Sequence, residues 1–197
     1  MAVVLASASS ARRRMLEQAG VAALSDSAEV DEAAIKRSAA AAAHDATTTA
    51  GLLAEAKARA VAGRHPGALV IGADQMLECD GGWYDKPGSP DEARAQLTAL
   101  RGRSHTLISA AVILRDQRLL WHGADRARLT MRDFSDAFLE TYLTEGGEAL
   151  CWTVGCYRIE GPGIQLFSQV EGDHFVILGL PLLGLLAALR ELGELTS

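Results

Sequence analysis

The chain has 197 residues and a formal net charge of −6, and 49% of its residues are hydrophobic. This length suits one well-buried domain, residues 1–197, with room for two lobes around one cleft. The hydrophobic content excludes wholesale disorder. The acidic balance argues against a general nucleic-acid binder, which needs a basic face, although one small nucleotide needs only a local positive cluster. We therefore expect a globular protein with no nucleic-acid partner.

The cysteines and apolar stretches indicate where the protein works. Cys79, Cys151 and Cys156 show neither CxxC spacing nor an even count, which favours reduced thiols over a disulfide framework. The most apolar stretch, residues 175–189, is shorter than the roughly 20 residues of a membrane span and contains Pro181. The N-terminus has no signal-peptide pattern. These features predict a soluble cytoplasmic protein with no membrane partner.

Apolar runs alternate with amphipathic segments in the first half of the chain. We expect strands at residues 2–6 and 68–74 and helices at residues 9–20 and 49–62. Gly20 is a typical helix stop. Asp31 and Glu32 begin a polar connection, and the Ala-rich residues 38–49 carry little information.

The second half begins with a loop at residues 83–87, followed by a helix with a good start signal. Ser89 supplies a cap, Pro90 suits the first turn, and two acids follow. We expect helices at residues 89–100, 135–144 and 181–192 and strands at residues 104–114, 118–129, 154–159 and 174–178. Strands mixed with helices predict an α/β or α+β fold with a sheet covered by helices.

Three arginines, Arg12, Arg13 and Arg14, open the first helix at the end where its dipole is already positive. Hydroxyls such as those of Ser9 and Ser10 can cap only some of the first-turn N–H groups. Free donors, a positive dipole and guanidinium groups together favour an anion, most naturally a phosphate. The alternative is a surface helix with solvated arginines.

Several carboxylates and one lysine are further candidates. Asp74 directly follows a buried apolar run, and α/β proteins place their sites at the carboxyl ends of strands. It could deprotonate water or hold a divalent metal; alone, it could equally start a turn. Lys86 could meet a phosphate or be an ordinary surface lysine. Glu171 and Asp173 could bind metal or form a solvated turn, and Glu160 could accept from the N–H donors of a base.

Three common enzyme classes have no support in the sequence. The five histidines do not fall in HExxH spacing, and no Walker loop or GxSxG motif is present. A zinc hydrolase, a P-loop NTPase and an α/β-hydrolase are therefore unsupported.

An ordered set of motifs is more specific than any of its members. The set comprises Leu5-Ala-Ser-Ala-Ser-Ser-Ala-Arg-Arg-Arg14, Ile71-Gly-Ala-Asp-Gln75, Asp85-Lys-Pro87, Gly102-Arg-Ser-His105, Glu171-Gly-Asp173 and Gly179-Leu-Pro181. In this order it resembles the Maf family of nucleoside triphosphate pyrophosphatases, also called septum formation inhibitors. The resemblance runs from residue 4 to about residue 190.

The resemblance implies hydrolysis of a nucleoside triphosphate to the monophosphate and pyrophosphate, assisted by Mg²⁺ or Mn²⁺. It implies an inosine-triphosphatase-like α/β fold, an elongated mixed sheet flanked by helices around a deep cleft. Asp74 would be the proton acceptor. Ser9, Arg12, Arg13, Lys57 and Lys86 would hold the phosphates, with Glu32 in the same cleft and Glu32 and Asp74 as metal ligands. A cationic clamp and a metal suit pyrophosphate, which leaves with several negative charges.

Three base-facing positions differ between subgroups of the family and correspond here to Ala11, Gln75 and Glu160. The subgroup linked to 7-methyl-GTP has an aromatic residue, Gln and Glu, so the chain matches it at two positions. Ala11 offers no ring to stack on a base, and Trp152 or Tyr157 could replace it. Glutamate suits a purine such as guanine, whose ring N–H and amino group both donate.

Two other functions remain open from the sequence. The family's association with division arrest allows a regulatory protein that restrains septum formation through a partner. A nucleotide sensor without turnover would need an incomplete catalytic set, whereas the set here is complete. The main prediction is a nucleotide-pool enzyme acting on modified or non-standard nucleotides, and the resemblance suggests a homodimer.

Overall fold

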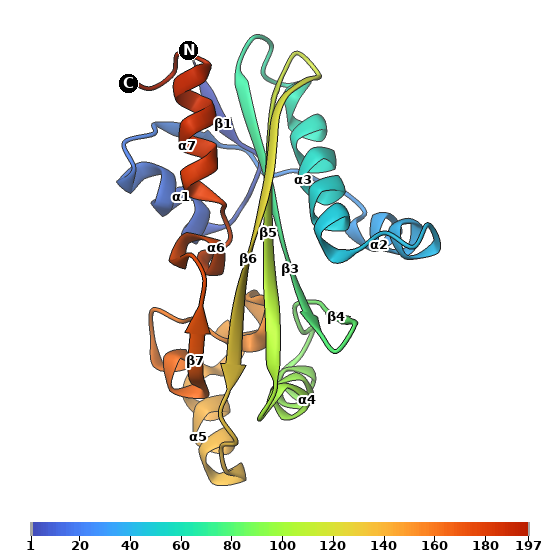
Figure 1. Ribbon diagram of the computed structural model, residues 1–197, viewed down its shortest axis with the longest axis vertical. Coiled ribbons are helices and arrows are strands. Elements are labelled where there is room, and N and C mark those ends of the chain that lie inside the picture. Colours follow the sequence, from blue (N-terminus) through green and yellow to red (C-terminus); the bar gives the residue numbers. More distant parts are fainter. Residues whose placement is uncertain (1, 197) are drawn as a thin grey trace. The chain divides into compact units, whose positions relative to one another are not determined.

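The computed structural model describes residues 2–196, which form a mixed α/β structure around one sheet (Figure 1). The strands follow the order β2-β1-β3-β5-β6-β7, and β4 pairs with β3. They are β1 (Val3–Leu5), β2 (Ala23–Ser25), β3 (Leu69–Cys79), β4 (Gly82–Tyr84), β5 (Ser104–Arg115), β6 (Arg118–Met131) and β7 (Phe167–Glu171). Strand β1 is parallel to β2 and β3, whereas β3–β4 and β6–β7 are antiparallel. The predicted α/β class with a mixed sheet is confirmed.

The helices separate these strands along the chain. They are α1 (Ser10–Gln18), α2 (Glu32–Ala41), α3 (Ala46–Ala62), α4 (Pro90–Leu100), α5 (Asp136–Gly146), α6 (His174–Leu178) and α7 (Leu182–Glu191), with 3₁₀ turns η1 (Gly147–Trp152), η2 (Val154–Cys156) and η3 (Pro162–Leu166). None of the helices in residues 2–196 has the length and apolar character needed to cross a membrane.

The chain forms two compact units. The first contains the chain up to Gln75, Ile108–Asp125 and the chain from His174 onward, and the second contains Met76–Leu107 and Arg126–Asp173. The long strands β3, β5 and β6 each contribute to both units. The expectation of a single domain over residues 1–197 stays a prediction.

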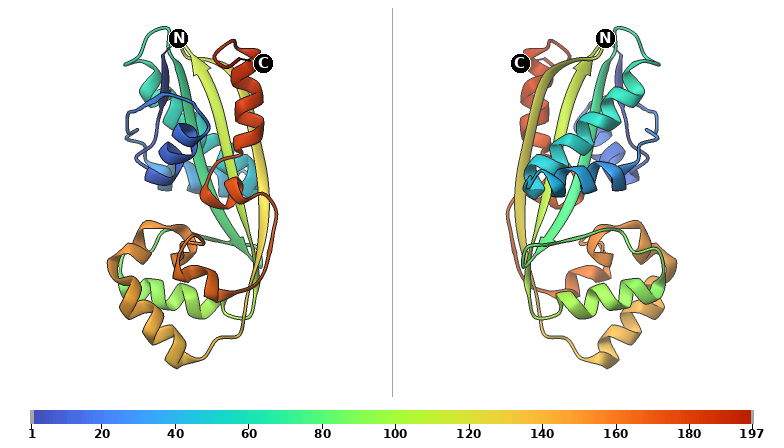
Figure 2. Two further views of the ribbon diagram at one scale, coloured as in Figure 1. Left: turned by 90° about the vertical axis from the view of Figure 1, so that its left-hand side faces the viewer. Right: turned by 90° about the vertical axis from the view of Figure 1, so that its right-hand side faces the viewer.

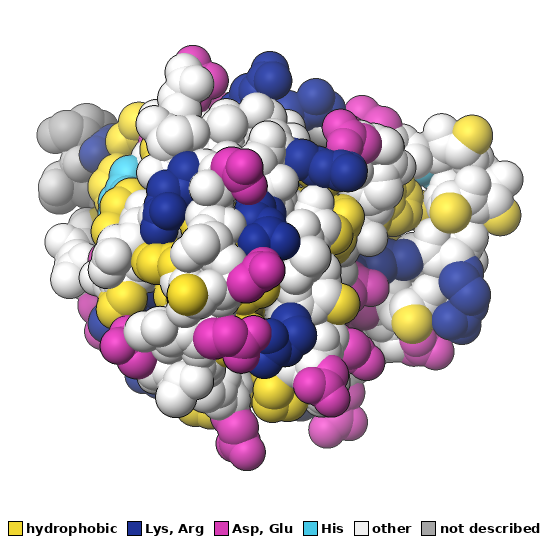
Figure 3. Space-filling model, turned by 90° about the horizontal axis from the view of Figure 1, so that it is seen from below, with side chains coloured by type: hydrophobic (Ala, Val, Ile, Leu, Met, Phe, Trp, Pro, Cys, Tyr) yellow, Lys and Arg dark blue, Asp and Glu magenta, His cyan; other side chains and the backbone are white. Residues whose placement is uncertain are grey.

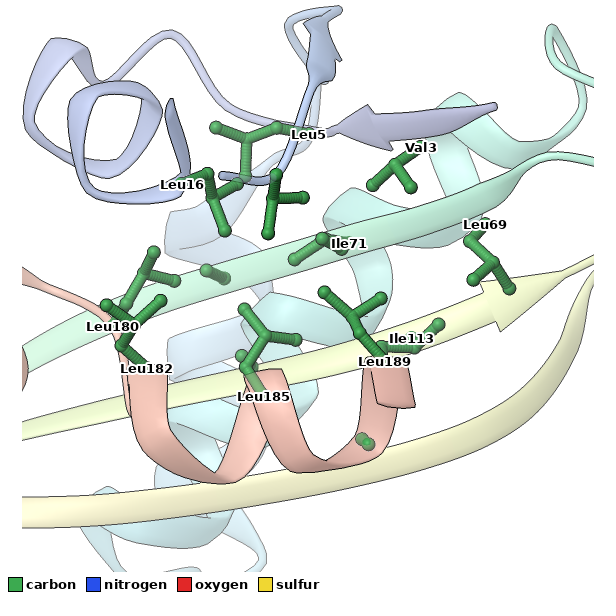
Figure 4. Close-up of a cluster of buried hydrophobic side chains, with 14 of the residues drawn as sticks. Val3, Leu5, Leu16, Leu69, Ile71, Ile113, Leu180, Leu182, Leu185 and Leu189 are labelled. Atoms are coloured by element: carbon green, nitrogen blue, oxygen red, sulfur yellow. The ribbon is translucent and has the colours of Figure 1, made fainter. Parts of the chain in front are cut away.

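In the first unit, helices cover both faces of the sheet. Helices α1, α6 and α7 lie on one face and α2 and α3 on the other, as Figure 1 and the two side views of Figure 2 show. On the α1 and α7 face, Leu5, Ile71 and Ile113 of three neighbouring strands meet Leu16 and Leu185 (Figure 4). All five side chains are fully buried, and each contributes about 1.5–3 kcal/mol relative to exposure.

On the opposite face, Gly72 lets α3 approach β3 very closely. A Cβ atom at Gly72 would lie 2.0 Å from the carbonyl oxygen of Ala54 and 2.8 Å from Cβ of Ala58. No side chain fits there, because the obstructing atom belongs to the helix backbone. The close approach holds the middle of α3 against the strand.

The second unit has an aromatic centre around a buried histidine. His105 of β5 is 1% exposed, its Nε2 lies 2.7 Å from Tyr157 Oη, and its ring is 5.9 Å from that of Phe167. Burial lowers the pKa of His105 to about 4. The imidazole is therefore neutral in the folded protein at physiological pH.

The surface carries charges of both signs. Figure 3 shows Lys and Arg side chains interspersed with Asp and Glu on the face seen from below Figure 1. In the second unit, Arg94 of α4 pairs with Glu140 of α5, and Arg101 pairs with Asp136 at 2.7 Å. Because these pairs are partly solvent-exposed, each contributes at most about 1 kcal/mol.

Two predicted strands are wrong. Residues 154–159 form the turn η2 and an irregular segment, because Gly155 and Cys156 have φ values of +78° and +62° that a strand cannot accommodate. Residues 174–178 form helix α6, since an apolar run as short as residues 175–178 does not distinguish strand from helix. Gly179, with φ of +109°, ends that helix.

Helix α2 was not expected from the sequence. Asp31 and Glu32 do not begin a polar connection: the Asp31 side chain accepts a hydrogen bond from Ala34 N at 2.8 Å and caps α2. In the same way, Asp45 caps α3 by accepting from Thr48 N at 2.8 Å. The Ala-rich segment is therefore the end of one helix and the start of another, which alanine favours.

We expect Gly72→Ala to lower the free energy of unfolding by about 3 kcal/mol, because the added methyl group forces α3 away from β3. The control is Gly51→Ala in α3, where a Cβ meets no described atom within 4 Å. That change adds helix propensity and should stabilise by up to about 1 kcal/mol. Denaturant unfolding measures both, and equal stabilities would contradict the close approach.

The buried His105 should make the free energy of unfolding depend on pH. Its pKa falls from the ordinary value of 6.5 to about 4 on folding, so the unfolded chain binds the proton first. The stability contributed by the neutral ring is complete above pH 6.5 and is lost between pH 6.5 and 4, by about 3 kcal/mol in total. His105→Phe should lack this loss in urea unfolding curves recorded across that range. Parallel pH profiles of the two proteins would contradict the assignment.

Candidate functional site

The candidate site lies where β1 stops beside the longer β3. Leu5, the last residue of β1, pairs with Ile71, and Ala6 N donates to Ile71 O at 2.8 Å. Beyond this point the chain turns away into α1, while β3 continues to Cys79. The prediction that Asp74 ends its strand is therefore wrong, since it lies in the middle of β3. The site nevertheless lies at the carboxyl end of a strand, as expected. That strand is β1, and its end leaves this part of β3 without β1 as a neighbour.

Arg12 occupies the edge that β1 leaves uncovered. Its Nη1 donates to Ala73 O at 2.9 Å and its Nε donates to Gly179 O at 2.9 Å. Nη1 also lies 3.3 Å from Ser7 Oγ. The side chain thereby joins β3, the turn after α6 and the segment before α1. Arg12 is 9% exposed, so the alternative of solvated arginines does not hold for this residue.

The charges around Arg12 are mixed. Burial lowers the pKa of its guanidinium, and the carboxylates of Asp74 and Glu32 act in the opposite direction. Arg13, one residue on, has a side chain that is 53% exposed, with Glu17 3.7 Å away. Of these two arginines, Arg13 is thus the more open to a ligand from solution.

Lys57 of α3 lies between two carboxylates. Its Nζ is 2.5 Å from Asp74 Oδ1 and 2.8 Å from Glu32 Oε1. The Lys57 and Asp74 side chains are 12% and 7% exposed, whereas Glu32 is 47% exposed. Glu32 is the first residue of α2 and Lys57 lies in α3. Helix α2, helix α3 and strand β3 thus bring together two carboxylates and one ammonium group that are distant in the sequence.

Neighbouring residues of β3 serve opposite faces of the sheet. Gly72 and Asp74 face α3, whereas Gln75 turns to the other face. Nε2 of Gln75 lies 3.2 Å from Ser109 Oγ and 3.0 Å from each of two carbonyl oxygens in α6. This residue therefore connects the site to the end of α6.

The N-terminus of α1 supplies the remaining residues of the first unit. Ser9 caps the helix, and its Oγ accepts from Arg12 N at 3.4 Å. Ala11 is half-buried in the first turn, which contains no acidic residue. The positive end of the helix dipole is therefore not offset by a carboxylate within that turn.

The structure thus brings together Ser9, Arg12, Glu32, Lys57, Asp74 and Gln75 in the first unit. Lys86 lies in the loop between β4 and α4, and Glu160 lies between η2 and η3; both are exposed and belong to the second unit. Their part in the site remains a prediction, as does metal binding by Glu171 at the end of β7 and by Asp173.

Of the two aromatic residues considered for stacking, Tyr157 is not available. It is 5% exposed and is engaged by His105 and by Phe167, whose ring is 4.7 Å away. Trp152 is 62% exposed, with the guanidinium of Arg158 5.8 Å from its ring.

Three residues that hold the site together were not recognised from the sequence. Ser7 and Ser109 bond Arg12 and Gln75, and Gly179 offers Arg12 its carbonyl. The only indication of a role for Gly179 in the sequence is its place in the motif Gly179-Leu-Pro181. Ser109 lies within an apolar run that predicts nothing beyond a buried strand.

Comparison with known proteins identifies the family. The Maf family, described as "Maf-like protein", matches residues 2–192. The chain therefore belongs to the Maf family.

Relatives match along their whole lengths. A protein of Paramagnetospirillum magneticum named nucleoside triphosphate pyrophosphatase is 58% identical over 98% of this chain and 99% of its own. One of Granulibacter bethesdensis with the same name is 51% identical over all of both chains. A protein of Rhizobium meliloti named 7-methyl-GTP pyrophosphatase is 44% identical over 99% and 98%. Among solved structures, a nucleoside-triphosphatase (dITP/XTP pyrophosphatase) of Mycobacterium abscessus aligns with a TM-score of 0.39 and 18% identity, over 68% of this chain and 76% of that one.

The two neighbouring arginines should differ in their effect on stability. Arg12→Lys removes a buried planar donor that serves two backbone carbonyls, so we expect a loss of about 2–4 kcal/mol in the free energy of unfolding. Arg13→Lys changes an exposed side chain and should cost less than about 0.5 kcal/mol. Thermal and urea unfolding of both variants measure the difference, and similar losses would contradict the role given to Arg12.

Proposed function

We propose that this protein is a nucleoside triphosphate pyrophosphatase, which cleaves its substrate to the nucleoside monophosphate and pyrophosphate. The observation that carries the proposal is the ion-paired group of Glu32, Lys57 and Asp74 beside the N-terminus of α1. The group combines a buried carboxylate with the Lys57 ammonium, and Arg12 lies near it, so two cations suited to an anionic substrate accompany the carboxylates. Relatives named nucleoside triphosphate pyrophosphatase and 7-methyl-GTP pyrophosphatase support the same activity and favour it over a regulatory protein that acts only through a partner.

The residues suggest how the reaction proceeds. A water oxygen attacks the α-phosphorus and the bond from that phosphorus to the bridging oxygen breaks, so pyrophosphate leaves with the electron pair. Oδ1 of Asp74 accepts from Lys57, while Oδ2 has no hydrogen-bond partner within residues 2–196. We assign Oδ2 as the atom that takes the water proton. The Lys57 ammonium lies beside this carboxylate and holds its side chain in place.

Phosphate binding is assigned to the cations and to the helix end. Arg13 is exposed at the N-terminus of α1, where unpaired N–H groups and the dipole attract an anion. Arg12 uses Nε and Nη1 on backbone carbonyls, so only Nη2 can reach a phosphate. Ser9, Lys57 and Lys86 complete the proposed set.

We propose Mg²⁺ or Mn²⁺ as the cofactor of this site. No group of three or more His, Cys, Asp or Glu suited to a metal is present in the described part of the chain. Glu32 and Asp74 nevertheless point at one cation, the Lys57 ammonium. Mg²⁺ is commonly held by one or two carboxylates together with substrate phosphates, so these two residues would hold it. When bound, the metal would neutralise charge on the phosphates.

The substrate class is proposed more finely from the base-facing residues. Gln75 and Glu160 with Ala11 match two of three positions of the subgroup linked to 7-methyl-GTP, and the Rhizobium meliloti relative carries that name. We infer a modified or non-standard purine triphosphate and a role in clearing the nucleotide pool. Trp152 is the exposed ring that could stack on such a base. We also infer a cytoplasmic homodimer with no nucleic-acid partner.

The direct test is pyrophosphate release with Mg²⁺ or Mn²⁺ across standard nucleotides, 7-methyl-GTP, ITP and 5-substituted pyrimidine triphosphates. Asp74→Asn removes the proton acceptor and should lower kcat by at least about 10²-fold. Asp133→Asn makes the same change at an exposed residue of the second unit and should leave kcat unchanged.

Two outcomes would contradict the proposal. Folded wild-type protein that releases no pyrophosphate from any member of the panel would favour a regulatory protein. Full activity in Asp74→Asn would remove Asp74 from the mechanism.

A further inference from the structure

The side-chain amide of Gln75 is fixed at its nitrogen end. Nε2 faces three oxygens: the carbonyls of Val176 and Ile177, each at 3.0 Å, and Ser109 Oγ at 3.2 Å. The two carbonyls can only accept. The hydroxyl of Ser109 donates to Val176 O at 2.8 Å, so its oxygen also accepts from Gln75. Three acceptors around one end of the amide identify that end as the NH₂ group.

The oxygen end of the same amide is what remains for a ligand. Oε1 of Gln75 has no hydrogen-bond partner among residues 2–196, and the side chain is half-buried. Gln75 follows Asp74 directly on β3, and its side chain lies on the opposite face of the sheet, toward α6. Reversing the amide would place Oε1 against three acceptor oxygens and forfeit every bond made by the NH₂ group. Gln75 therefore offers a ligand an acceptor and no donor.

Ser109 makes this arrangement complete. It lies in β5 next to β3, is fully buried, and bonds both Gln75 and α6. The carbonyls of Val176 and Ile177 belong to the last turn of α6. Gly179 N donates to Val176 O at 3.1 Å, and Gln75 and Ser109 supply further donors to these carbonyls, so the end of α6 and the orientation of the amide are linked.

We propose that Ser109 is a positioning residue that fixes Gln75 as an acceptor for a hydrogen-bond donor of the nucleoside part of the substrate. This inference rests on the proposed function. The triphosphate is excluded as the partner because its ionised oxygens only accept. The donors of a nucleotide are the N–H groups of the base and the O–H groups of the sugar. Either kind of group can donate a hydrogen bond to Oε1.

The test compares kcat/KM for pairs of triphosphates that differ in one donor. GTP with ITP tests the 2-amino group, GTP with 1-methyl-GTP tests the ring N–H, and ATP with purine riboside triphosphate tests the 6-amino group. GTP with 2′-deoxy-GTP and 3′-deoxy-GTP tests the sugar. Wild-type enzyme should prefer the donor-bearing member of at least one pair by about tenfold, because the other member leaves Oε1 unpaired. The pair that responds identifies base or sugar as the source.

Two variants examine the residues themselves. Gln75→Met keeps the length of the side chain without the acceptor and should reduce that preference to within about twofold. Ser109→Ala removes one of three anchors and should reduce it about threefold. Ser104→Ala is the matched control, since Ser104 lies in β5 and its hydroxyl bonds Thr130, 2.8 Å away, instead of Gln75. A purely structural loss lowers kcat/KM for both members of a pair and leaves their ratio unchanged.

The outcomes separate this inference from the proposed function. If wild-type protein hydrolyses triphosphates but shows no preference within any pair, or a preference that survives Gln75→Met, the inference is overturned and the proposed function stands. If Ser109→Ala keeps the full preference, the positioning role of Ser109 is overturned. If wild-type protein hydrolyses no triphosphate, both fail.

Discussion

The ammonium group of Lys57, held between Glu32 and Asp74, is the interaction on which the proposed site depends. Asp74 is buried, and an isolated charge there would be costly without a cation beside it. Lys57 reaches the strand only because α3 packs directly on Gly72, two residues before Asp74. The absence of a side chain at Gly72 thus permits Lys57 to pair with Asp74.

The edge of β3 imposes a second constraint. Where β1 ends, the carbonyl of Ala73 loses the strand partner that it would otherwise have, and the guanidinium of Arg12 bonds it instead. The same guanidinium bonds Gly179, while Gln75 and Ser109 hold the last carbonyls of α6. Side chains thus replace backbone pairing around the site. The side chains of Arg12, Gln75 and Ser109 therefore also maintain the fold.

Much of this arrangement could be predicted from the sequence, for identifiable reasons. The apolar run before Asp74 indicates its strand, and the basic residues at the start of α1 indicate an anion site. The ordered motifs gave the family, which the match over residues 2–192 confirms. The pairing of Lys57 with Asp74 and Glu32 could not be derived from spacing, because it depends on how closely α3 approaches β3.

The errors also have physical causes. The strand containing Asp74 continues to Cys79, and its last residues pair with β4, a contact that the local sequence does not record. The end of the helix at residues 174–178 is bonded by the backbone of Gly179 and by the distant side chains of Gln75 and Ser109, contacts that local periodicity does not record. The alternative of a solvated Arg12 is wrong because two backbone carbonyls accept hydrogen bonds from its buried guanidinium, which the sequence does not reveal.

The most direct test of the central claim is a crystal structure with a non-hydrolysable nucleoside triphosphate and Mn²⁺, located by its anomalous scattering. We expect Mn²⁺ against the carboxylates of Asp74 and Glu32, with the triphosphate at the N-terminus of α1. A bound nucleotide whose phosphates and metal lie away from Asp74, Glu32 and Lys57 would contradict it.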